Sequence, residues 1–437
     1  MRRGSVDIIT LGCSKNLVDS ERLIAQFRAN GLKVRHDPDR VNAETVVINT
    51  CGFIADAQEE SIRMILECGQ LRKEGKIGRL FVMGCLSQKF RRELEAEIPE
   101  VDGWYGKFDW NALLKDTGHV WNGEMENERC LTTPPHYAYL KIAEGCNRGC
   151  AYCAIPLMTG PYRSRSMDDI LDETHRLLRK GVKEIQLIAQ DLTFYGRDTY
   201  GKPMIADLVS RMSDMKGLEW LRLHYGYPDQ FPLDILPVMR ERDNVCRYLD
   251  IALQHISDSV LKRMRRNISS SGTRELLARI REEVPGIHLR TTLMTGFPGE
   301  TDEDFGELME FVDEQRFERM GAFSYCEVEG TYSALHYKDD VPENVKQSRL
   351  DMLMQRQQSI SLELNESKVG KLFRTVIDRT EGGYYVGRTE FDSPEVDPEM
   401  LVDAVDGGLE TGVFYDVKVI RAEEFDLYGT VENILTR

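Results

Sequence analysis

Three cysteines within eight residues constrain this chain more than any other stretch of its sequence. They lie in Cys146-Asn-Arg-Gly-Cys150-Ala-Tyr-Cys153, a C-x3-C-x2-C spacing with a glycine before the first and the second cysteine. Soft thiolates select zinc, copper(I) or iron–sulfur clusters. A structural zinc ion usually takes four protein ligands, and no fourth cysteine or histidine lies next to this trio. The spacing therefore predicts an iron–sulfur cube with one open iron; three incidental thiols in a tight turn are the alternative.

The length and composition of the chain predict several domains. At 437 residues it is too long for one hydrophobic core. No apolar run is long enough to span a membrane, and the N-terminus lacks the apolar core of a signal peptide. We therefore expect a cytoplasmic protein with no membrane partner, whose ten cysteines serve metal or redox chemistry rather than disulfides. The formal net charge of −16 argues against non-specific nucleic-acid binding and permits a strongly basic partner.

The first 130 residues alternate apolar runs with helical patterns, which predicts a parallel sheet covered by helices. Strands are expected at Val6–Leu11, Thr45–Asn49 and Leu80–Met83, and helices at Ser20–Ala29, Ala57–Leu71 and Lys89–Glu97. Each of these strands is followed by a cysteine beside a glycine: Cys13, Cys51 and Cys85. Because open sheets bind ligands beyond the carboxyl ends of their strands, we expect a second three-thiolate cluster site. Buried structural cysteines are the alternative.

The remaining four cysteines have no such placement. Cys68 lies within a helical pattern, Cys246 just before a strand and Cys326 just after one. These three and Cys130 are expected to be core or surface thiols.

A linker with paired prolines, residues 130–136, precedes six strand–helix units that predict a partial (β/α) barrel. Its strands are expected at Ala138–Ile142, Glu184–Ala189, Glu219–Leu223, Arg247–Ala252, His288–Leu293 and Ala322–Tyr325. The trio Cys146, Cys150 and Cys153 follows the first of these strands. In barrels of this kind the working groups come from the carboxyl ends of the strands.

Side chains at the other strand ends are therefore candidates for binding a cofactor beside that trio. They are Gln190 and Asp191 after the second strand, His224 to Pro228 after the third, Gln254 after the fourth, and Thr295, Gly296, Phe297 and Pro298 after the fifth. The run Leu261–Arg266 adds cations near the same mouth. Common turns and solvent-facing charges are the alternative for each set taken alone.

From about residue 370 the pattern changes to short β-type runs. They lie at Lys371–Asp378, Tyr384–Arg388, Leu401–Val402, Val413–Arg421 and Leu427–Val431, and predict a small antiparallel barrel. Residues 369–437 contain 15 acidic and 7 basic residues, a formal charge of −8. Such a surface repels phosphate and attracts a basic protein; an acidic surface that serves only solubility is the alternative.

Taken together, these motifs resemble the radical S-adenosylmethionine (SAM) methylthiotransferases over the whole chain. The motifs that carry the resemblance are Leu11-Gly-Cys-Ser-Lys-Asn, Asn49-Thr-Cys-Gly-Phe-Ile, Gly84-Cys-Leu and Glu144-Gly-Cys-Asn-Arg-Gly-Cys-Ala-Tyr-Cys153. The resemblance implies an α/β fold in three parts: a cluster-binding domain (1–130), a radical-SAM barrel (131–369) and a TRAM β-barrel (370–437).

The resemblance also implies two 4Fe–4S clusters and SAM as cofactors. Cys146, Cys150 and Cys153 would hold the cluster that cleaves SAM, and Cys13, Cys51 and Cys85 the cluster that handles sulfur. The SAM contacts would be Tyr152, Gln190, Asp191, Gln254, Thr295, Gly296, Phe297 and Pro298. The sequence departs from the family pattern after the second strand of the barrel, where Ala189-Gln190-Asp191 stands in place of the Gly-Gly-Glu of many radical-SAM proteins. This departure affects which residues are assigned as SAM contacts.

The opening motif and the acidic tail favour the RimO-type branch of this family. That branch adds a methylthio group to the β-carbon of an aspartate in small-subunit ribosomal protein S-twelve, a basic partner met either free or within the ribosomal subunit. A deoxyadenosyl radical would abstract the hydrogen, and an external electron donor would be needed. The alternatives are a tRNA methylthiotransferase acting near the anticodon, which the charge disfavours, and a non-catalytic iron–sulfur binding or delivery protein.

Overall fold

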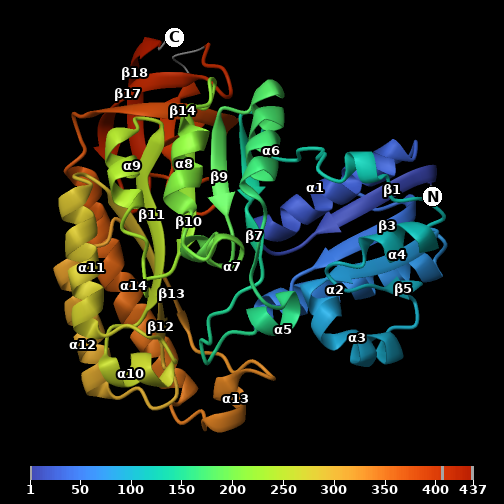
Figure 1. Cartoon of the computed structure of the whole chain (residues 1–437), viewed down its shortest axis with the longest axis horizontal. Coiled ribbons are helices and arrows are strands. Elements are labelled where there is room, and N and C mark those ends of the chain that lie inside the picture. Colours follow the sequence, from blue (N-terminus) through green and yellow to red (C-terminus); the bar gives the residue numbers. More distant parts are fainter. Residues whose placement is uncertain (1, 405–407, 435–437) are drawn as a thin grey trace.

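The computed structural model describes residues 2–404 and 408–434. Three sheets follow one another along the chain: an open sheet of five strands, an open sheet of six, and a closed five-stranded barrel (Figure 1). No helix in these described residues is long and apolar enough to cross a membrane. The predicted domain ends at residues 1 and 437 lie outside the described residues, and the boundaries near 130 and 369 remain predictions.

The N-terminal sheet is parallel, with the order β2-β1-β3-β4-β5. Its strands are β1 (Arg2–Thr10), β2 (Lys33–His36), β3 (Ala43–Thr50), β4 (Arg79–Gly84) and β5 (Gly103–Trp104). The helices are α1 (Ser14–Ala29), α2 (Ala55–Lys73), α3 (Cys85–Glu97) and α4 (Trp110–Asp116), with the 3-10 turn η1 (Gly123–Met125). The three predicted strands are confirmed; β2 and β5 are short edge strands that the apolar pattern did not reveal.

Helix α1 begins at Ser14, six residues before its predicted start. Its first turns carry polar side chains, so the sequence pattern favours a loop there. In the structure Lys15, Asn16 and Asp19 are nevertheless buried. The reason is tertiary, because these turns lie between the N-terminal sheet and strand β6 of the central sheet.

The central sheet is also parallel, in the order β13-β12-β11-β10-β9-β6, and all six predicted strands are confirmed. The strands are β6 (Tyr137–Lys141), β9 (Glu184–Ile188), β10 (Trp220–Gly226), β11 (Val245–Gln254), β12 (His288–Thr295) and β13 (Arg319–Ser324). The longer helices, of seven residues or more, are α6 (Met167–Arg179), α8 (Ile205–Ser213), α9 (Ile235–Glu241), α11 (Ser270–Glu283), α12 (Asp302–Gln315) and α14 (Glu343–Glu366). Shorter elements are β7 (Ala143–Glu144), α5 (Ile155–Thr159), β8 (Arg163–Ser164), η2 (Leu192–Phe194), α7 (Arg197–Tyr200), α10 (Asp258–Arg263) and α13 (Tyr332–His336).

The two faces of the central sheet differ in polarity. Leu140, Leu187 and Leu223 belong to the main apolar core beneath the helices. Their neighbours along the strands, such as Gln186 and His224, point to the other face and hydrogen-bond each other at 2.7 Å. The concave face of the partial barrel is therefore polar, as a face that receives ligands needs to be.

The C-terminal strands close into a barrel in the order β14-β15-β16-β18-β17. They are β14 (Leu372–Glu381), β15 (Tyr384–Thr389), β16 (Met400–Asp403), β17 (Phe414–Ala422) and β18 (Leu427–Ile434). The five predicted strands are present, but β16 and β18 pair in parallel rather than antiparallel. This follows from the odd number of strands, because five strands that alternate in direction cannot close without one parallel pair.

The loop between β15 and β16 reaches into the central sheet. Tyr139 donates a hydrogen bond to Glu395 (3.2 Å), and Tyr248 donates one to Asp397 (2.7 Å). Arg319 pairs with Asp392 at 2.6 Å. Part of the negative charge of the C-terminal segment therefore serves contacts inside the molecule rather than its outer surface.

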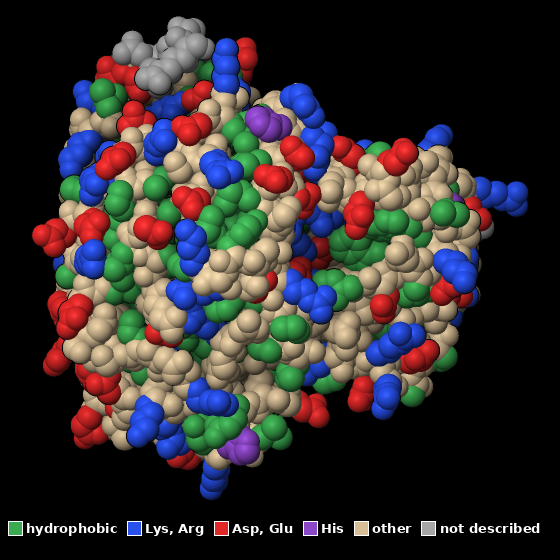
Figure 2. All heavy atoms as spheres, viewed as in Figure 1, with side chains coloured by type: hydrophobic (Ala, Val, Ile, Leu, Met, Phe, Trp, Pro, Cys, Tyr) green, Lys and Arg blue, Asp and Glu red, His purple; other side chains and the backbone are tan. Residues whose placement is uncertain are grey.

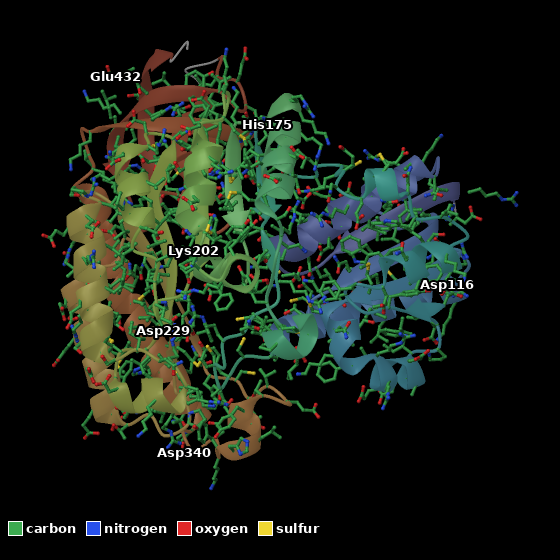
Figure 3. The ribbon with its side chains drawn as sticks, viewed as in Figure 1. Asp116, His175, Lys202, Asp229, Asp340 and Glu432 are labelled. Atoms are coloured by element: carbon green, nitrogen blue, oxygen red, sulfur yellow. The ribbon has the colours of Figure 1, made fainter. Side chains whose placement is uncertain are left out.

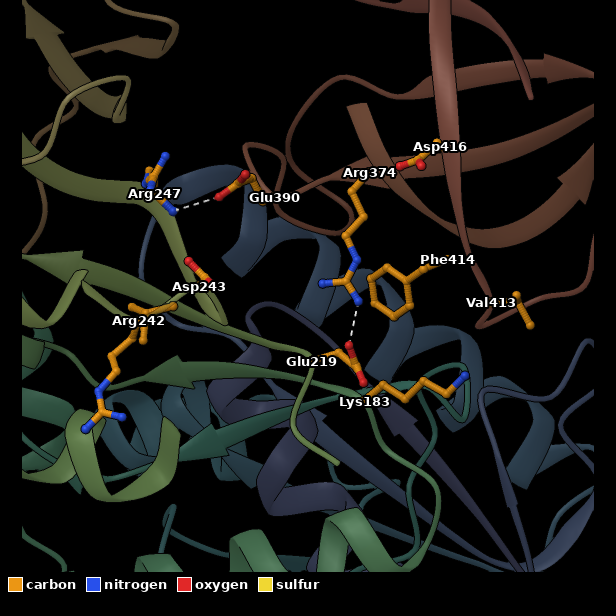
Figure 4. A pocket seen from close by; sticks show the side chains of 11 residues that line it. Lys183, Glu219, Arg242, Asp243, Arg247, Arg374, Glu390, Val413, Phe414 and Asp416 are labelled. Carbon is orange, nitrogen blue, oxygen red and sulfur yellow. Dashed lines mark hydrogen bonds and ion pairs between the residues drawn. The ribbon is translucent and has the colours of Figure 1, made fainter. Parts of the chain in front are cut away.

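A charged cavity of about 610 Å³ lies where the small barrel meets the first residues of β10 and β11 (Figure 4). Arg374 pairs there with Glu219 at 2.5 Å, and the Arg247 backbone N–H donates to Glu390 at 3.3 Å. In Figure 3, Glu432 of the small barrel and Asp340 of the central domain mark opposite ends of the molecule. This cavity is at the amino ends of the central strands, whereas the cysteine loop follows the carboxyl end of β6.

Candidate functional site

The N-terminal trio, Cys13, Cys51 and Cys85, follows β1, β3 and β4, which are neighbours in one parallel sheet. Their loops are in close contact. A Cβ built on Gly12 would lie 2.8 Å from the sulfur of Cys51, and one built on Gly52 would lie 2.8 Å from the backbone nitrogen of Leu86. The structure thus brings the three cysteine loops together at one edge of the sheet.

Asn16, which the sequence did not single out as a site residue, joins these loops. Its side-chain amide donates to the carbonyls of Leu11 (3.0 Å) and Thr50 (3.1 Å). The Cys85 thiol lies 3.8 Å from the side-chain oxygen (Oδ1) of Asn16. The only sequence signal for Asn16 was its position three residues after Cys13, at the end of the motif Leu11-Gly-Cys-Ser-Lys-Asn.

Burial and charge act differently on the three thiols. Burial raises the pKa of Cys85 to about 12 and also raises the pKa of Cys51. Burial acts in the same direction on Cys13, but the cations Lys15 and Lys107 outweigh it and lower the pKa of that thiol. Iron ligands must be thiolates, so cluster binding here would release protons.

The central trio, Cys146, Cys150 and Cys153, lies in a loop between β7 and α5. Gly145 enters this loop with φ +83°, and the Cys146 N–H donates to the Gly160 carbonyl at 3.2 Å. Cys150 lies 3.6 Å from the Tyr227 hydroxyl and 3.9 Å from the Arg266 guanidinium. The loop is therefore fixed both by its own turn and by the ends of neighbouring strands.

The thiols of the central trio are close enough to influence one another. Burial raises the pKa of Cys146 to about 11 and the pKa of Cys153 still further, and the neighbouring thiolates of the trio raise both. In the described part of the chain, no three His, Cys, Asp or Glu side chains are arranged around a point for a single metal ion. A cube has a different requirement, because each of its cysteines binds a separate iron.

Two of the predicted SAM contacts offer unsatisfied acceptors. The side-chain carbonyl oxygens of Gln190 and Gln254 are buried without a hydrogen-bond partner in the described residues. Gln254 also has φ +72°, a conformation that few residues other than glycine adopt. Buried polar atoms are rarely left unpaired, so these two oxygens fit a ligand with amino or hydroxyl donors, such as SAM.

Two aromatic candidates lie beside the cysteine loop. The rings of Tyr152 and Phe297 meet edge to face, 6.4 Å apart. Arg266 donates to the Tyr152 hydroxyl at 3.0 Å, and burial holds the pKa of that tyrosine well above its usual range. Tyr152 therefore stays neutral and serves to position Arg266 next to Cys150.

The other candidates make contacts within the protein. Asp191 pairs with Arg148 at 2.7 Å. The Thr295 hydroxyl donates to the Lys346 carbonyl at 3.3 Å, and the Gly296 N–H donates to Glu300 at 2.8 Å. The Pro298 carbonyl accepts from Arg263 at 2.7 Å. Their assignment as SAM contacts stays a prediction.

A buried charge network that the sequence did not reveal connects the two domains. Lys107 lies 3.5 Å from Asp19 and 3.2 Å from Glu144, and Lys141 contacts the same two carboxylates. Burial opposes ionisation of Glu144, but the two lysines outweigh it and lower its pKa to about 2. Glu144 also accepts a hydrogen bond from Gln190. The network thus joins the neighbourhood of one trio to that of the other.

The end of β10 also lies between the trios. The Lys15 ammonium is 3.3 Å from the centre of the Tyr225 ring, while Tyr227 contacts Cys150. Tyr225 and Tyr227 are two residues apart, and a separation of two residues spans at most about 7 Å. Figure 2 shows a hollow between the N-terminal lobe and the rest of the molecule, with charged side chains gathered in it, and Asp229 in Figure 3 follows this strand end.

Comparison with known families matches three parts of the chain. Residues 5–106 match the Uncharacterized protein family UPF0004, residues 140–312 the Radical SAM superfamily, and residues 369–431 the TRAM domain. Among solved structures, the radical S-adenosylmethionine methyltransferase TsrM from Kitasatospora setae has a TM-score of 0.53 at 15% identity, covering 88% of this chain and 81% of that one. OxsB, a cobalamin-dependent S-adenosylmethionine radical enzyme, has a TM-score of 0.51 at 13% identity, covering 84% and 63%. These two likenesses establish the fold.

Curated relatives match from end to end. The ribosomal protein uS12 methylthiotransferase RimO of Parabacteroides distasonis is 63% identical over 99% of this chain and 100% of its own length. The enzymes of the same name from Porphyromonas gingivalis and Flavobacterium johnsoniae are 62% and 50% identical, covering 99% and 98% of this chain and 100% and 98% of their own lengths. With its two cysteine trios, radical-SAM sheet and TRAM barrel, the chain belongs to the RimO family of ribosomal protein uS12 methylthiotransferases.

Proposed function

We propose that this protein adds a methylthio group to the β-carbon of an aspartate in ribosomal protein uS12, with two 4Fe–4S clusters and SAM as cofactors. The observation that carries the proposal is the position of β10, whose end touches Cys150 on one side and Lys15, two residues after Cys13, on the other. A substrate side chain placed at this strand end would lie beside both trios. Because the substrate is a ribosomal protein, the reaction would take place in the cytoplasm.

In this proposal each trio holds one cluster. Cys146, Cys150 and Cys153 would hold the cluster that binds SAM, and Cys13, Cys51 and Cys85 the cluster that carries sulfur. When bound, the two clusters and SAM supply what no tuned acid or base can, a radical able to break an unactivated C–H bond and the methylthio group.

The chain's own residues hold the reacting partners in place. The free carbonyl oxygens of Gln190 and Gln254 would accept hydrogen bonds from SAM. The ion pair of Arg148 with Asp191 and the contact of Arg266 with Tyr152 fix two cations beside the central trio. Loop 390–399 covers the amino end of the polar face, which leaves the hollow between the domains as the approach to the carboxyl end.

Single-cysteine variants reconstituted without oxygen test this assignment. Cys146→Ala should lose about four irons per chain and all SAM cleavage to 5′-deoxyadenosine. Cys13→Ala should lose a similar amount of iron and all methylthio transfer to uS12, yet still form 5′-deoxyadenosine. The exposed Cys326, replaced by alanine, is the matched control. Methylthio transfer by Cys13→Ala, measured by mass spectrometry of uS12, would contradict the proposal.

A further inference from the structure

Lys15 is a buried cation without a carboxylate partner. It lies in the first turn of α1 and is 8% exposed. Within residues 2–404 and 408–434 its ammonium makes no ion pair or hydrogen bond. It lies 3.3 Å from the centre of the Tyr225 ring and acts electrostatically on the Cys13 thiol. Burying an ammonium group is costly unless an anion compensates it. The described residues supply no carboxylate for this cation.

Three neighbouring cations differ from Lys15 because each has an acidic partner. Lys107 and Lys141 share Asp19 and Glu144. On the other side of the strand end, Arg148 pairs with Asp191 and with Asp229, at 2.7 and 3.3 Å. These three cations are neutralised within the protein. Arg266 has no carboxylate partner but hydrogen-bonds the Tyr152 hydroxyl and the Ala252 carbonyl, whereas Lys15 has neither kind of partner among the described residues.

The position of Lys15 defines where that ligand would lie. Lys15 belongs to the N-terminal domain, and its ammonium group lies over the Tyr225 ring at the carboxyl end of β10. Burial and nearby cations, Lys15 among them, hold the pKa of His224 well below its usual range, so this neighbour stays neutral and supplies no charge of its own. An anion bound by Lys15 would therefore sit in the hollow between the trios.

We propose that Lys15 binds the side-chain carboxylate of the residue that is modified and so selects an acidic side chain over its neutral amide. This rests on the proposed function, in which the reacting carbon of the substrate is bonded directly to that carboxylate. A cation that holds the carboxylate therefore also fixes the position of the carbon bonded to it. A charge-assisted contact of this kind also discriminates aspartate from asparagine, which has the same shape and no charge.

Peptide binding tests the proposal independently of catalysis. Two fluorescent peptides would be used, one with the uS12 sequence around the modified aspartate and one with asparagine in its place. With the reconstituted wild-type protein, the aspartate peptide should bind at least about tenfold more tightly, the size expected for one charge-assisted hydrogen bond. In Lys15→Met, which keeps the length of the side chain, the two affinities should become equal. Lys15→Arg should keep the preference, and Lys76→Met, at an exposed lysine of the same domain, should match the wild type.

The outcomes separate this proposal from the proposed function. Equal binding of the two peptides by the wild type, or binding of neither, would overturn the role of Lys15. So would a preference for aspartate that persists in Lys15→Met with its fold and iron content intact. A wild-type protein that prefers the aspartate peptide but never methylthiolates it would instead refute the proposed function and leave the carboxylate site in place.

Discussion

Two glycines of the central cysteine loop differ in what surrounds them, although they look equivalent in the sequence. Gly145 has φ +83°, and a Cβ there would lie 2.1 Å from the Pro161 carbonyl oxygen. At Gly149 the nearest atom, on Arg265, is 4.0 Å from such a Cβ. Backbone on the far side of the loop therefore approaches Gly145 so closely that no side chain fits.

We predict that Gly145→Ala displaces the central trio while Gly149→Ala does not. A positive φ combined with a backbone clash costs on the order of 1–3 kcal/mol, and the strain falls next to Cys146. After anaerobic reconstitution, Gly145→Ala should contain about half the iron of the wild type and form little 5′-deoxyadenosine. Full iron content in Gly145→Ala, or a loss in both variants, would show that the close approach does not control the loop.

Among the elements, the segment just before the central sheet is more than a linker. Arg129 is buried and pairs with Glu21 of α1 and with Glu173 of α6, at 2.5 and 2.8 Å. It also donates to the Tyr139 carbonyl of β6 at 2.6 Å. One side chain thus connects elements of two domains.

Replacing Arg129 by methionine should destabilise the fold strongly. The change leaves the buried carboxylate of Glu21 without its ion-pair partner, whereas Glu173 keeps Arg22 and Arg165. Removing one partner of a buried ion pair typically costs about 3–5 kcal/mol. Urea unfolding of Arg129→Met, compared with Arg176→Met at a partly exposed ion pair with Glu128, measures this. The control should lose no more than about 1 kcal/mol. Equal losses in both variants would mean that Arg129 does not hold the two domains together.

For the molecule as a whole, the contact between the small barrel and the central sheet depends on pH. Asp378 of β14 pairs with Arg388 at 2.5 Å and with His136 at 2.7 Å. Burial opposes its ionisation, but Arg388 and His136 outweigh this and lower the pKa of Asp378 from 3.8 to about 2. A carboxyl group with a lowered pKa stabilises the fold above its unfolded pKa, and this contribution disappears as the pH falls through the folded pKa.

The free energy of unfolding should therefore fall as the pH drops from about 4 to about 2, with Asp378 contributing about 2 kcal/mol of the change. In Asp378→Asn this part of the pH dependence should be absent, so its curve should be flatter than that of the wild type. Glu381→Gln, at an exposed ion pair, is the control and should follow the wild type. A slope in Asp378→Asn equal to that of the wild type would rule out this carboxylate as a source.

The acidic small barrel meets the amino ends of β10 and β11, whereas the central trio lies in the loop after β7, beyond the carboxyl end of β6. If this barrel binds basic protein, it must contact a part of the substrate far from the modified residue. Reversing Glu423, Glu424 and Asp426 to lysine should then lower kcat/KM for uS12 about tenfold at low salt and much less at high salt. The matched control reverses Glu275, Glu282 and Glu310 on the outer helices. Loss of activity in both triple variants would point to net charge alone.

The sequence by itself determined most of the elements and the strand ends at which the cysteines lie. Strand periodicity placed Cys13, Cys51 and Cys85 at successive strand ends. Because β1, β3 and β4 run parallel, these three ends lie at the same edge of the sheet. The spacing of the central trio fixed its loop in the same way. These features depend on residues close together in the chain, which is where periodicity and turn chemistry act.

Only the tertiary structure decided which polar side chains share the space between the trios. Nothing local to Lys15 predicts its contact with Tyr225, and Lys107 meets Glu144 only because two domains pack together. Loop 390–399 likewise enters a sheet that begins some 250 residues earlier in the chain. Such contacts depend on how separately formed sheets dock, and the electrostatic energy of a buried charge depends on partners from both sides of the interface.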